Sequence, residues 1–374
     1  MFGPGSEWTG NYFESWARPI ALEYYDTAGQ KQFQFDGGVE IHGNLTRNLR
    51  QKGLHVMTGG QYGSDDVRYQ LFPDKSRDRF ESFILRASGG DQYATFFRDA
   101  MMQRLVTGQM DMDADKQAYQ PAIVFLNGQY WGIHNIREKV DAGFIDQNHG
   151  YDETEIDFLE FRDTVIEGSN TAYRAMVNYI DSNDMNNPIH YDFVKSQMEV
   201  DQFMNYWLSE VYFANTDWPS NNIKFWRPQT GKWRWILFDT DSGFDLADAD
   251  KYNLDTLTAT TTGSTWPTRI SRNLVNNTEF RQEFIQRFAT HPSITFAPTR
   301  LIAIIDEMQD VLEPEMPAHI AKWRDLVGGM AFSSCGFGED KVEIMRVLPI
   351  NGRITSTPTC KTASQPIQQV ARPT

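Results

Sequence analysis

Patterns typical of strands occupy the first third of this chain, and patterns typical of helices follow them. This segregation is the strongest constraint on its fold. Between residues 18 and 130, apolar side chains alternate with polar ones or form short runs bounded by turn residues, which favours strands. From about residue 138, apolar side chains recur every three or four positions, which favours helices. Strands first and helices second predict an α+β protein, with a β-rich lobe over about 18–137 and a mainly helical lobe over 138–325.

Two hairpins stand out among these patterns. Asn127-Gly128 is the strongest short hairpin signal in the chain. Thr230-Gly231 separates a second pair of apolar runs. The paired runs are 122–126 with 130–133, and 223–226 with 233–238.

Residues 200–212 form the clearest helical pattern. Their apolar side chains recur at i, i+3, i+4, i+7 and i+8, which places them on one face of a helix. They are Val200, Phe203, Met204, Trp207, Leu208, Val211 and Tyr212. Other helices are expected at 96–106, 279–289 and 299–312, and other strands at 20–25, 39–41, 54–57 and 82–86, with a turn at Gly37-Gly38.

Composition and charge exclude several classes of function. The 35 basic and 50 acidic side chains give a formal net charge of −15, which argues against nucleic acid or an anionic membrane as the main partner. Only two cysteines are present, Cys335 and Cys360. A disulfide framework and a thiolate zinc site are therefore excluded, while one bridge between the two is left open. No apolar run approaches the length of a membrane span.

The two ends of the chain differ from its middle. The first ten residues lack a basic stretch followed by an apolar one, so no signal peptide is expected there. Residues 326–374 are rich in Ser, Thr, Pro, Gln and Gly, with few apolar side chains after Ile354. This composition predicts a poorly ordered tail after a domain over residues 1–325.

The residues most suggestive of chemistry lie in the loop after the 200–212 helix. Asp217 and Asn222 are five positions apart, as are the Asp and Asn of the kinase catalytic loop. In that loop the Asp orients the attacking hydroxyl and accepts its proton, and the Asn offers a carbonyl oxygen to a metal. A structural alternative is that both residues only cap turns.

Two further carboxylates follow the second hairpin. Asp239 ends the apolar strand, and Asp241 follows two positions later. A carboxylate at the end of a strand can hold a metal that bridges phosphate oxygens. The two side chains can share a metal only if the chain bends after Asp239, which Gly243 permits; otherwise both are solvated turn residues. In a real site, the carboxyl oxygens of Asp217 and Asp239 and the Asn222 amide should converge on one point.

A phosphate site also needs cations, and the first half of the chain offers candidates. Lys52 is the expected phosphate-binding lysine, because kinases carry theirs on a strand of the first lobe. Glu138 is expected to open a helix and to pair with Lys52. Arg47 and Arg86 flank strands and are the alternative phosphate partners. The structural alternatives are a strand-end lysine, a glutamate that favours the helix dipole and surface ion pairs.

Several longer segments follow the pattern of a known family. They are W-A-R-P-I-A-L-E-Y-Y-D (16–26), G-G-V-E-I-H-G-N-L-T-R (37–47), Y-Q-L-F-P-D (69–74), F-I-L-R (83–86), F-F-R-D-A (96–100), V-F-L-N-G-Q-Y-W-G-I-H-N-I-R-E-K-V-D (124–141), Y-F-A-N-T-D-W-P-S-N-N-I-K-F-W-R-P (212–228) and G-K-W-R-W-I-L-F-D-T-D-S-G-F (231–244). With these segments in order, the chain resembles the CotH kinase family, named for a spore coat protein, over about residues 11–325.

The resemblance implies an atypical protein-kinase-like fold with two lobes. It implies transfer of the γ-phosphoryl group of ATP, with Mg²⁺ or Mn²⁺, to Ser or Thr of coat or surface proteins. By position, Asp217 is similar to the catalytic aspartate, and Asn222 with Asp239 or Asp241 is similar to the metal ligands. The resemblance also implies a location in a spore coat, on a cell surface or outside the cell.

Two other classes of function are left open. A structural or adhesive surface protein could keep the fold without turnover, but it has no need of Asp217, Asn222 and Asp239 together. A metal-dependent phosphoesterase could use the same carboxylates, but it usually needs further His or Asp ligands, which the sequence does not offer.

Overall fold

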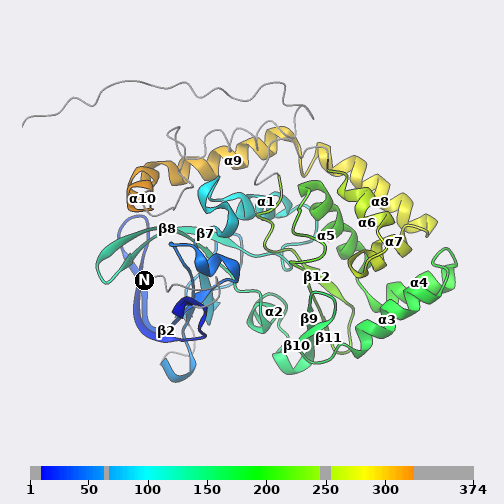
Figure 1. The fold of residues 1–374 in the computed structure, drawn as a ribbon, viewed down its shortest axis with the longest axis horizontal. Helices are drawn as coiled ribbons and strands as arrows, with labels where there is room; N and C mark the ends of the chain where they lie inside the picture. Colours follow the sequence, from blue (N-terminus) through cyan, green and yellow to red (C-terminus); the bar gives the residue numbers. More distant parts are fainter. Residues whose placement is uncertain (1–9, 63–66, 245–253, 324–374) are drawn as a thin grey trace, which may run out of the picture.

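The structure, a computed structural model, describes residues 10–62, 67–244 and 254–323. It contains both antiparallel sheets and helices, so the predicted α+β class is confirmed (Figure 1). The tail predicted at 326–374 lies outside the described residues. Within the described ranges, no helix is long and apolar enough to cross a membrane.

A six-stranded antiparallel sheet forms the first part of the fold. Its strands lie in the order β1-β2-β3-β6-β8-β7. Their bounds are β1 Arg18–Tyr25, β2 Lys31–His42, β3 Gly53–Met57, β6 Ser82–Arg86, β7 Tyr119–Leu126 and β8 Gln129–Arg137, while β4 Val67–Arg68 and β5 Arg79–Phe80 form a separate pair. Because β6 pairs with β3 on one side and β8 on the other, its last residue, Arg86, is held in the middle of the sheet.

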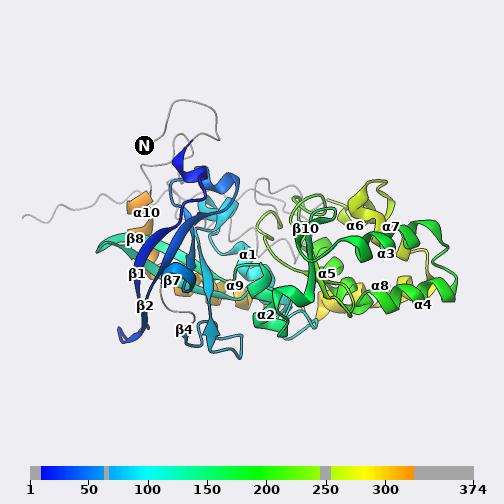
Figure 2. The same ribbon diagram turned by 90° about the horizontal axis from the view of Figure 1, so that it is seen from below.

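Helices pack around a second, smaller sheet in the rest of the fold. This sheet has the order β10-β9-β11-β12, with bounds β9 Ile156–Glu160, β10 Thr164–Glu167, β11 Lys224–Pro228 and β12 Arg234–Ile236. The helices are α2 Ala142–His149, α3 Thr171–Ser182, α4 Pro188–Gln197, α5 Val200–Phe213, α6 Thr256–Thr262, α7 Arg269–Leu274 and α8 Thr278–Thr290. Figure 2 shows the large sheet on one side of the molecule and most of these helices on the other.

Three helices connect the two parts. α1 (Arg98–Val106) lies between the large sheet and α5, and α9 (Pro298–Leu312) packs against α1 (Figure 1). α10 (Met316–Trp323) then returns to the large sheet. There the Trp323 ring meets the Trp131 ring edge-on, with centroids 5.2 Å apart. The last described helix therefore closes the chain back onto β8.

The helix predicted at 200–212 is confirmed as α5 and lies at the centre of the main hydrophobic core. All its residues except Asp201 and Tyr212 are buried. Trp207 stacks on Phe284 of α8, with ring centroids 4.0 Å apart. Burying a side chain such as Phe284 contributes roughly 1.5 to 3 kcal/mol. This packing fixes the point from which the following loop starts.

The two predicted hairpins are also present. Asn127 and Gly128 have φ values of 50° and 74°, as a two-residue turn of this kind requires. They connect β7 to β8, and Leu126 pairs with Gln129. β11 and β12 form the second hairpin. Of the other helices predicted, α1, α8 and α9 lie within two residues of their expected bounds.

The turn predicted at Gly37-Gly38 is wrong, because both glycines lie inside β2. Gly37 pairs with Ile20, and Gly38 pairs with Pro19. A Cβ atom on Gly37 would overlap the Met57 carbonyl oxygen of β3. Glycine is therefore required here for the close approach of two strands and not for a turn.

The expectation of helices from residue 138 onward is only partly met. Glu138 does not open a helix, because β8 ends at Arg137 and α2 begins at Ala142, after the capping residue Asp141. Two strands, β9 and β10, also lie in this range. β9 has only five residues, two of them acidic, and a segment this short cannot be assigned to helix or strand by its period.

We expect Gly37→Ala to destabilise the protein by about 1 to 3 kcal/mol, because the added Cβ forces β2 away from β3. Urea unfolding followed by circular dichroism measures the change. Asp36→Ala, at an exposed position of the same strand, is the matched control and should stay within about 0.5 kcal/mol of the parent. Equal unfolding midpoints for Gly37→Ala and the parent would contradict the close approach of the two strands.

Candidate active site

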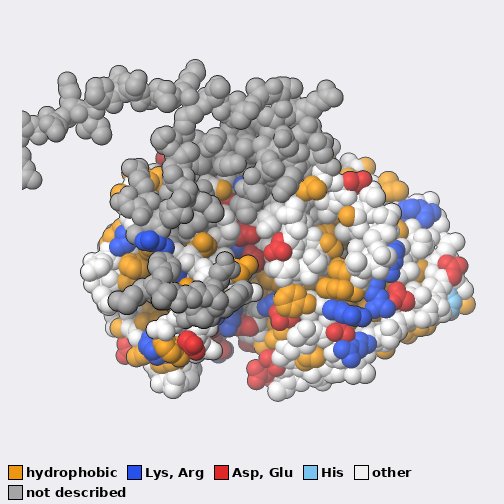
Figure 3. Space-filling model, in the orientation of Figure 1, with side chains coloured by type: hydrophobic (Ala, Val, Ile, Leu, Met, Phe, Trp, Pro, Cys, Tyr) orange, Lys and Arg blue, Asp and Glu red, His pale blue; other side chains and the backbone are white. Residues whose placement is uncertain are grey.

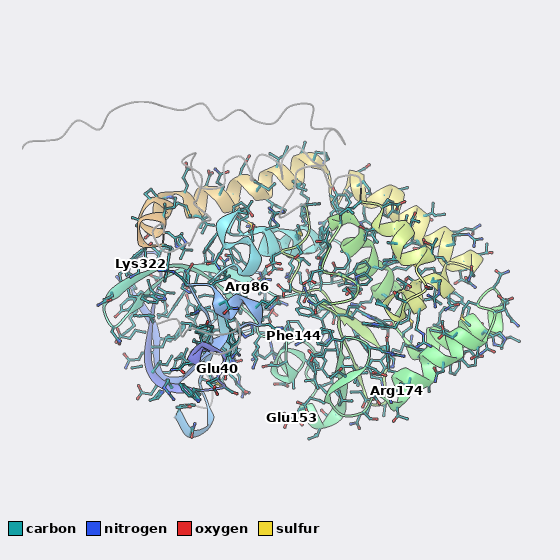
Figure 4. The ribbon with its side chains drawn as sticks, viewed as in Figure 1. Glu40, Arg86, Phe144, Glu153, Arg174 and Lys322 are labelled. Atoms are coloured by element: carbon teal, nitrogen blue, oxygen red, sulfur yellow. The ribbon has the colours of Figure 1, made fainter. Side chains whose placement is uncertain are left out.

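An arginine from the large sheet meets two aspartates that follow the β11–β12 hairpin. The Nη2 atom of Arg86 donates to Asp241 Oδ2 at 2.9 Å and also to Asp239 Oδ1. Gly90 N donates to the same Asp241 oxygen at 3.0 Å. Figure 4 shows Arg86 between the large sheet and the helical part. The structure thus brings three of the predicted site residues to one point.

The chain bends at Asp239 itself and not at Gly243. Asp239 has a φ of 53°, in the left-handed region that residues other than Gly, Asn and Asp rarely adopt. In an extended strand, the carboxylates of Asp239 and Asp241 would point to opposite faces. The bend instead turns both toward one cation, so the geometry that a shared metal would require is available.

Two adjacent residues of α1 hold this acidic turn in place. Arg98 Nη1 donates to the carbonyl oxygens of Gly243 and Phe244 at 2.9 and 2.8 Å. Asp99 Oδ1 accepts the Thr240 N–H at 2.9 Å. Both side chains are buried. Sequence reasoning assigned no role to Arg98 or Asp99, although both lie in the segment F-F-R-D-A.

Three carboxylates share two arginines around this point. Arg86 contacts Asp99, Asp239 and Asp241, and Arg137 Nη1 lies 2.5 Å from Asp99 Oδ2. Burial raises the pKa of Asp99, but the arginines outweigh it and hold that pKa well below its usual value. Burial and the adjacent Asp239 raise the pKa of Asp241 to about 7. The site therefore carries an excess of negative charge that a bound cation would offset.

The loop after α5 brings Asp217 and Asn222 together. Asn222 Nδ2 donates to Asp217 Oδ2 at 3.1 Å and to the Asp239 carbonyl oxygen at 3.3 Å. Asn221 Nδ2 donates to the same Asp217 oxygen at 3.0 Å. Asp217, Asn222 and the main chain of Asp239 are thus in contact, while the Asp239 carboxylate is directed to Arg86.

A buried glutamate of α5 supports this loop. Glu210 Oε2 accepts from Asn215 Nδ2 at 2.9 Å, and Asn215 Oδ1 accepts from the Asp217 N–H at 3.2 Å. Glu210 is fully buried, and its Oε1 has no hydrogen-bond partner among the described residues. Burial raises the pKa of Glu210 to about 8. At neutral pH the side chain is mostly protonated, so it fixes Asn215 without adding charge to the site.

Two predicted cations lie away from the carboxylates. Lys52 Nζ donates to the Arg47 carbonyl oxygen, and Arg47 Nε donates to the Gly43 carbonyl oxygen at 2.6 Å. Neither forms an ion pair with the two aspartates in the part of the chain that the structure describes. Arg86, one of the two alternative phosphate partners, is the predicted cation that reaches the site.

The predicted pair of Lys52 with Glu138 is wrong, because Glu138 pairs with Lys75. Lys75 Nζ lies 3.5 Å from Glu138 Oε2 and donates to Asn148 Oδ1 at 2.9 Å. Glu138 also accepts the Ala118 N–H at 2.7 Å. Both members of the pair are buried, so the pair supports the end of the large sheet from within. The available signal was the position of Lys75 directly after the segment Y-Q-L-F-P-D.

The oxygen donors of this site suit a hard divalent cation. Asp239 and Asp241 supply carboxylates, and no described residue donates to Asn222 Oδ1. No group of three or more His, Cys, Asp or Glu side chains that could hold a metal occurs within the described ranges. Mg²⁺ bound with a nucleotide needs only one or two protein carboxylates, since phosphates and water complete its ligands. The residues therefore fit a metal that arrives with ATP, and not a metal enclosed by protein alone.

The loop that pairs Asp217 with Asn222 and the two aspartates after the hairpin resemble the catalytic loop and the metal site of the kinase-like class. The sequence model of one family, described as CotH kinase protein, matches residues 39–335. This chain belongs to the CotH kinase family, as the resemblance predicted. A search of curated proteins finds no match.

Glu210→Gln should stabilise the protein at pH 8 and have little effect near pH 4.5. Below about pH 4.5 both the folded and the unfolded chain hold the Glu210 proton. As the pH rises toward 8, the unfolded chain releases this proton and the folded chain keeps it, so the parent loses stability. Between pH 5 and pH 8 the advantage of the variant should grow by about 3 kcal/mol.

Urea unfolding of parent and variant at several pH values measures this difference. Glu14→Gln, at an exposed position outside the helices and strands, is the matched control and should follow the parent at every pH. A Glu210→Gln advantage that does not change with pH would mean that Glu210 ionises normally in the folded protein.

Proposed function

We propose that this protein is an atypical protein kinase that transfers the γ-phosphoryl group of ATP to Ser or Thr side chains of other proteins. The proposal rests on one observation, the hydrogen bonds that join Asp217, Asn222 and Asp239 next to Arg86. Phosphoryl transfer depends mainly on positioning and on charge stabilisation. The Asp217 loop can supply the first, and the group around Arg86 can supply the second.

Asp217 is suited to orient the acceptor hydroxyl. Its Oδ2 is fixed by the amides of Asn221 and Asn222, while its Oδ1 accepts no hydrogen bond from any described residue. A free carboxylate oxygen beside a fixed one can accept the proton of an incoming hydroxyl group.

Arg86 and the two aspartates form the phosphate side of the proposed site. Asp239, Asp241 and Asn222 Oδ1 would hold Mg²⁺ or Mn²⁺, which supplies charge stabilisation for the phosphates when bound. Arg86 places a guanidinium at the same point, and guanidinium groups bind phosphate oxygens through paired N–H donors.

We further propose that the large sheet and the helical part act as the two lobes of a kinase-like fold. Arg86 comes from the first, and Asp217 and Asp239 come from the second. A nucleotide would bind between them, where Arg86 meets Asp239 and Asp241. Coat or surface proteins as acceptors, and a spore coat, cell surface or extracellular location, are proposed from membership of the family alone.

A non-catalytic structural or adhesive role is the second candidate. Arg86 already pairs with Asp239 and Asp241, so the acidic turn has a partner without any nucleotide. In such a protein these ion pairs would serve only to join the sheet to the helical part.

Asp217→Asn should lower phosphoryl transfer by about 100- to 10,000-fold, because positioning and proton acceptance are lost. It should leave the affinity for Mg-ATP nearly unchanged, since Asp217 does not face the phosphates in this proposal. Asp239→Asn should instead weaken ATP binding in a metal-dependent way, because a charged ligand is gone. Transfer from radiolabelled ATP and calorimetric titration with and without Mg²⁺ measure the two effects.

Asp36→Asn, an exposed change on β2, is the matched control and should behave as the parent. If the Asp217 and Asp239 variants both transfer phosphate from radiolabelled ATP and bind ATP as the parent does, the phosphoryl transfer is catalysed at another site. If the parent itself neither binds ATP nor transfers phosphate, the structural role is the better explanation.

A further inference from the structure

A pocket lies on the helical side of the loop that carries Asp217. Its cavity volume is about 380 Å³, within the range of specific binding sites. Eight of its 20 lining residues are aromatic, among them Phe161, Tyr173, Trp207, Trp218, Trp235 and Trp266. A cavity with such walls favours a flat or branched apolar group.

Part of the wall comes from the loop itself. Trp218 and Pro219 line the pocket and directly follow Asp217. Trp218 Nε1 donates to the Tyr206 hydroxyl of α5 at 2.8 Å, which fixes this wall against the core. Consecutive Cα atoms are about 3.8 Å apart, so the wall begins within about 4 to 8 Å of Asp217. Asp217 itself is not among the lining residues, so a group bound in the pocket lies beside the Asp217 loop and not at its carboxylate.

The rim of the pocket is basic, in contrast to the chain as a whole. Arg162, Arg174 and Arg269 line it against one carboxylate, Asp163, whereas the chain carries a net charge of −15. An adjoining hollow shares Arg162 and Arg269 and adds Arg272 and Asp181. Figure 3 shows Lys and Arg side chains gathered on this face near α3 and α7, and Figure 4 labels Arg174 there. A ligand with a negative charge beside its apolar group would match this rim.

Of the three arginines that line the pocket, Arg162 is the one without an acidic partner in the described ranges. Arg174 Nε lies 2.5 Å from Asp163 Oδ2, and Arg269 pairs with Asp181. Arg162 is exposed and forms no ion pair or hydrogen bond with any residue in the described ranges. A guanidinium in this state can bind a carboxylate through two parallel hydrogen bonds.

We propose that this pocket binds the acceptor protein. It takes an aromatic or large aliphatic side chain, and Arg162 binds an Asp or Glu next to that side chain in the acceptor. This inference rests on the proposed phosphoryl transfer. It adds which side chains of the acceptor protein are recognised. An extended peptide advances about 3.3 Å per residue, so the apolar residue should lie about two to four positions from the phosphorylated Ser or Thr.

A peptide fits this pocket better than a nucleotide does. None of Arg86, Asp239 and Asp241 lines the pocket. A base bound there would have to extend its phosphates past Asp217 to reach them. The acceptor hydroxyl, in contrast, must approach the phosphoryl group in line with the bond that breaks, from the side opposite the leaving group.

Binding of fluorescein-labelled peptides, followed by fluorescence anisotropy in the absence of nucleotide, tests the pocket. The main probe is a short peptide with one Ser, followed three positions later by Trp and then Asp. Two counterparts replace the Trp by Ala or the Asp by Lys. The Trp-Asp peptide should bind at least about 10-fold more tightly than either counterpart.

Variants of the protein separate the two parts of the pocket. Arg162→Glu should weaken binding of the Trp-Asp peptide at least about 10-fold and improve binding of the Trp-Lys peptide, because the charge is reversed. Arg18→Glu makes the same change at an exposed position of β1 and is the matched control. Trp266→Leu should weaken the binding of both Trp-containing peptides, whatever their charge.

Equal binding of the three peptides to the parent would overturn the proposal. Displacement of the bound peptide by ATP alone would also overturn it and would assign the pocket to the nucleotide. Peptide binding that depends on Arg162, without any phosphoryl transfer from ATP, would keep the docking pocket and contradict the proposed kinase activity instead.

Discussion

The ion pairs of Arg86 with Asp239 and Asp241 connect parts of the fold that are far apart in the sequence. β6 supplies the cation, and the turn after β12 supplies the carboxylates. Asp99 of α1 contacts both sides, because its carboxylate lies 3.8 Å from Arg86 Nε and accepts the Thr240 N–H. Buried ion groups add little stability over apolar packing of equal volume, because desolvation offsets the attraction. A functional role explains the three carboxylates around Arg86 better than a contribution to stability does.

The site also depends on backbone conformations that most residues avoid. Ala214, Asn222 and Asp239 all have φ values between 50° and 53°. A left-handed conformation costs roughly 1 to 2 kcal/mol for a residue other than glycine. Such conformations persist only where the surroundings determine the chain path on both sides. Here the buried helix α5 and the β11–β12 hairpin do so, and the acidic turn is bound in addition by Arg98.

Local patterns were enough to predict α5, both hairpins and the spacing of Asp217, Asn222 and the later aspartates, because these depend on residues near one another in the chain. The partners of charged groups depend on packing between distant segments. Glu138 therefore pairs with Lys75 rather than Lys52, and no periodicity marks the roles of Arg98 and Asp99. Gly37-Gly38 was mistaken for a turn, because glycine permits both a turn and the close approach of strands.

The charges of the two sides of the Asp217 loop have opposite signs. On one side, Asp99, Asp239 and Asp241 outnumber the arginines that they contact. On the other, arginines outnumber the one carboxylate that lines the pocket. A net charge of −15 describes the field at long range, whereas groups within a Debye length of about 8 to 10 Å determine recognition at a site. The acidic composition therefore argues against nucleic acid or an anionic membrane as the main partner, but it does not exclude an acidic segment held at this rim.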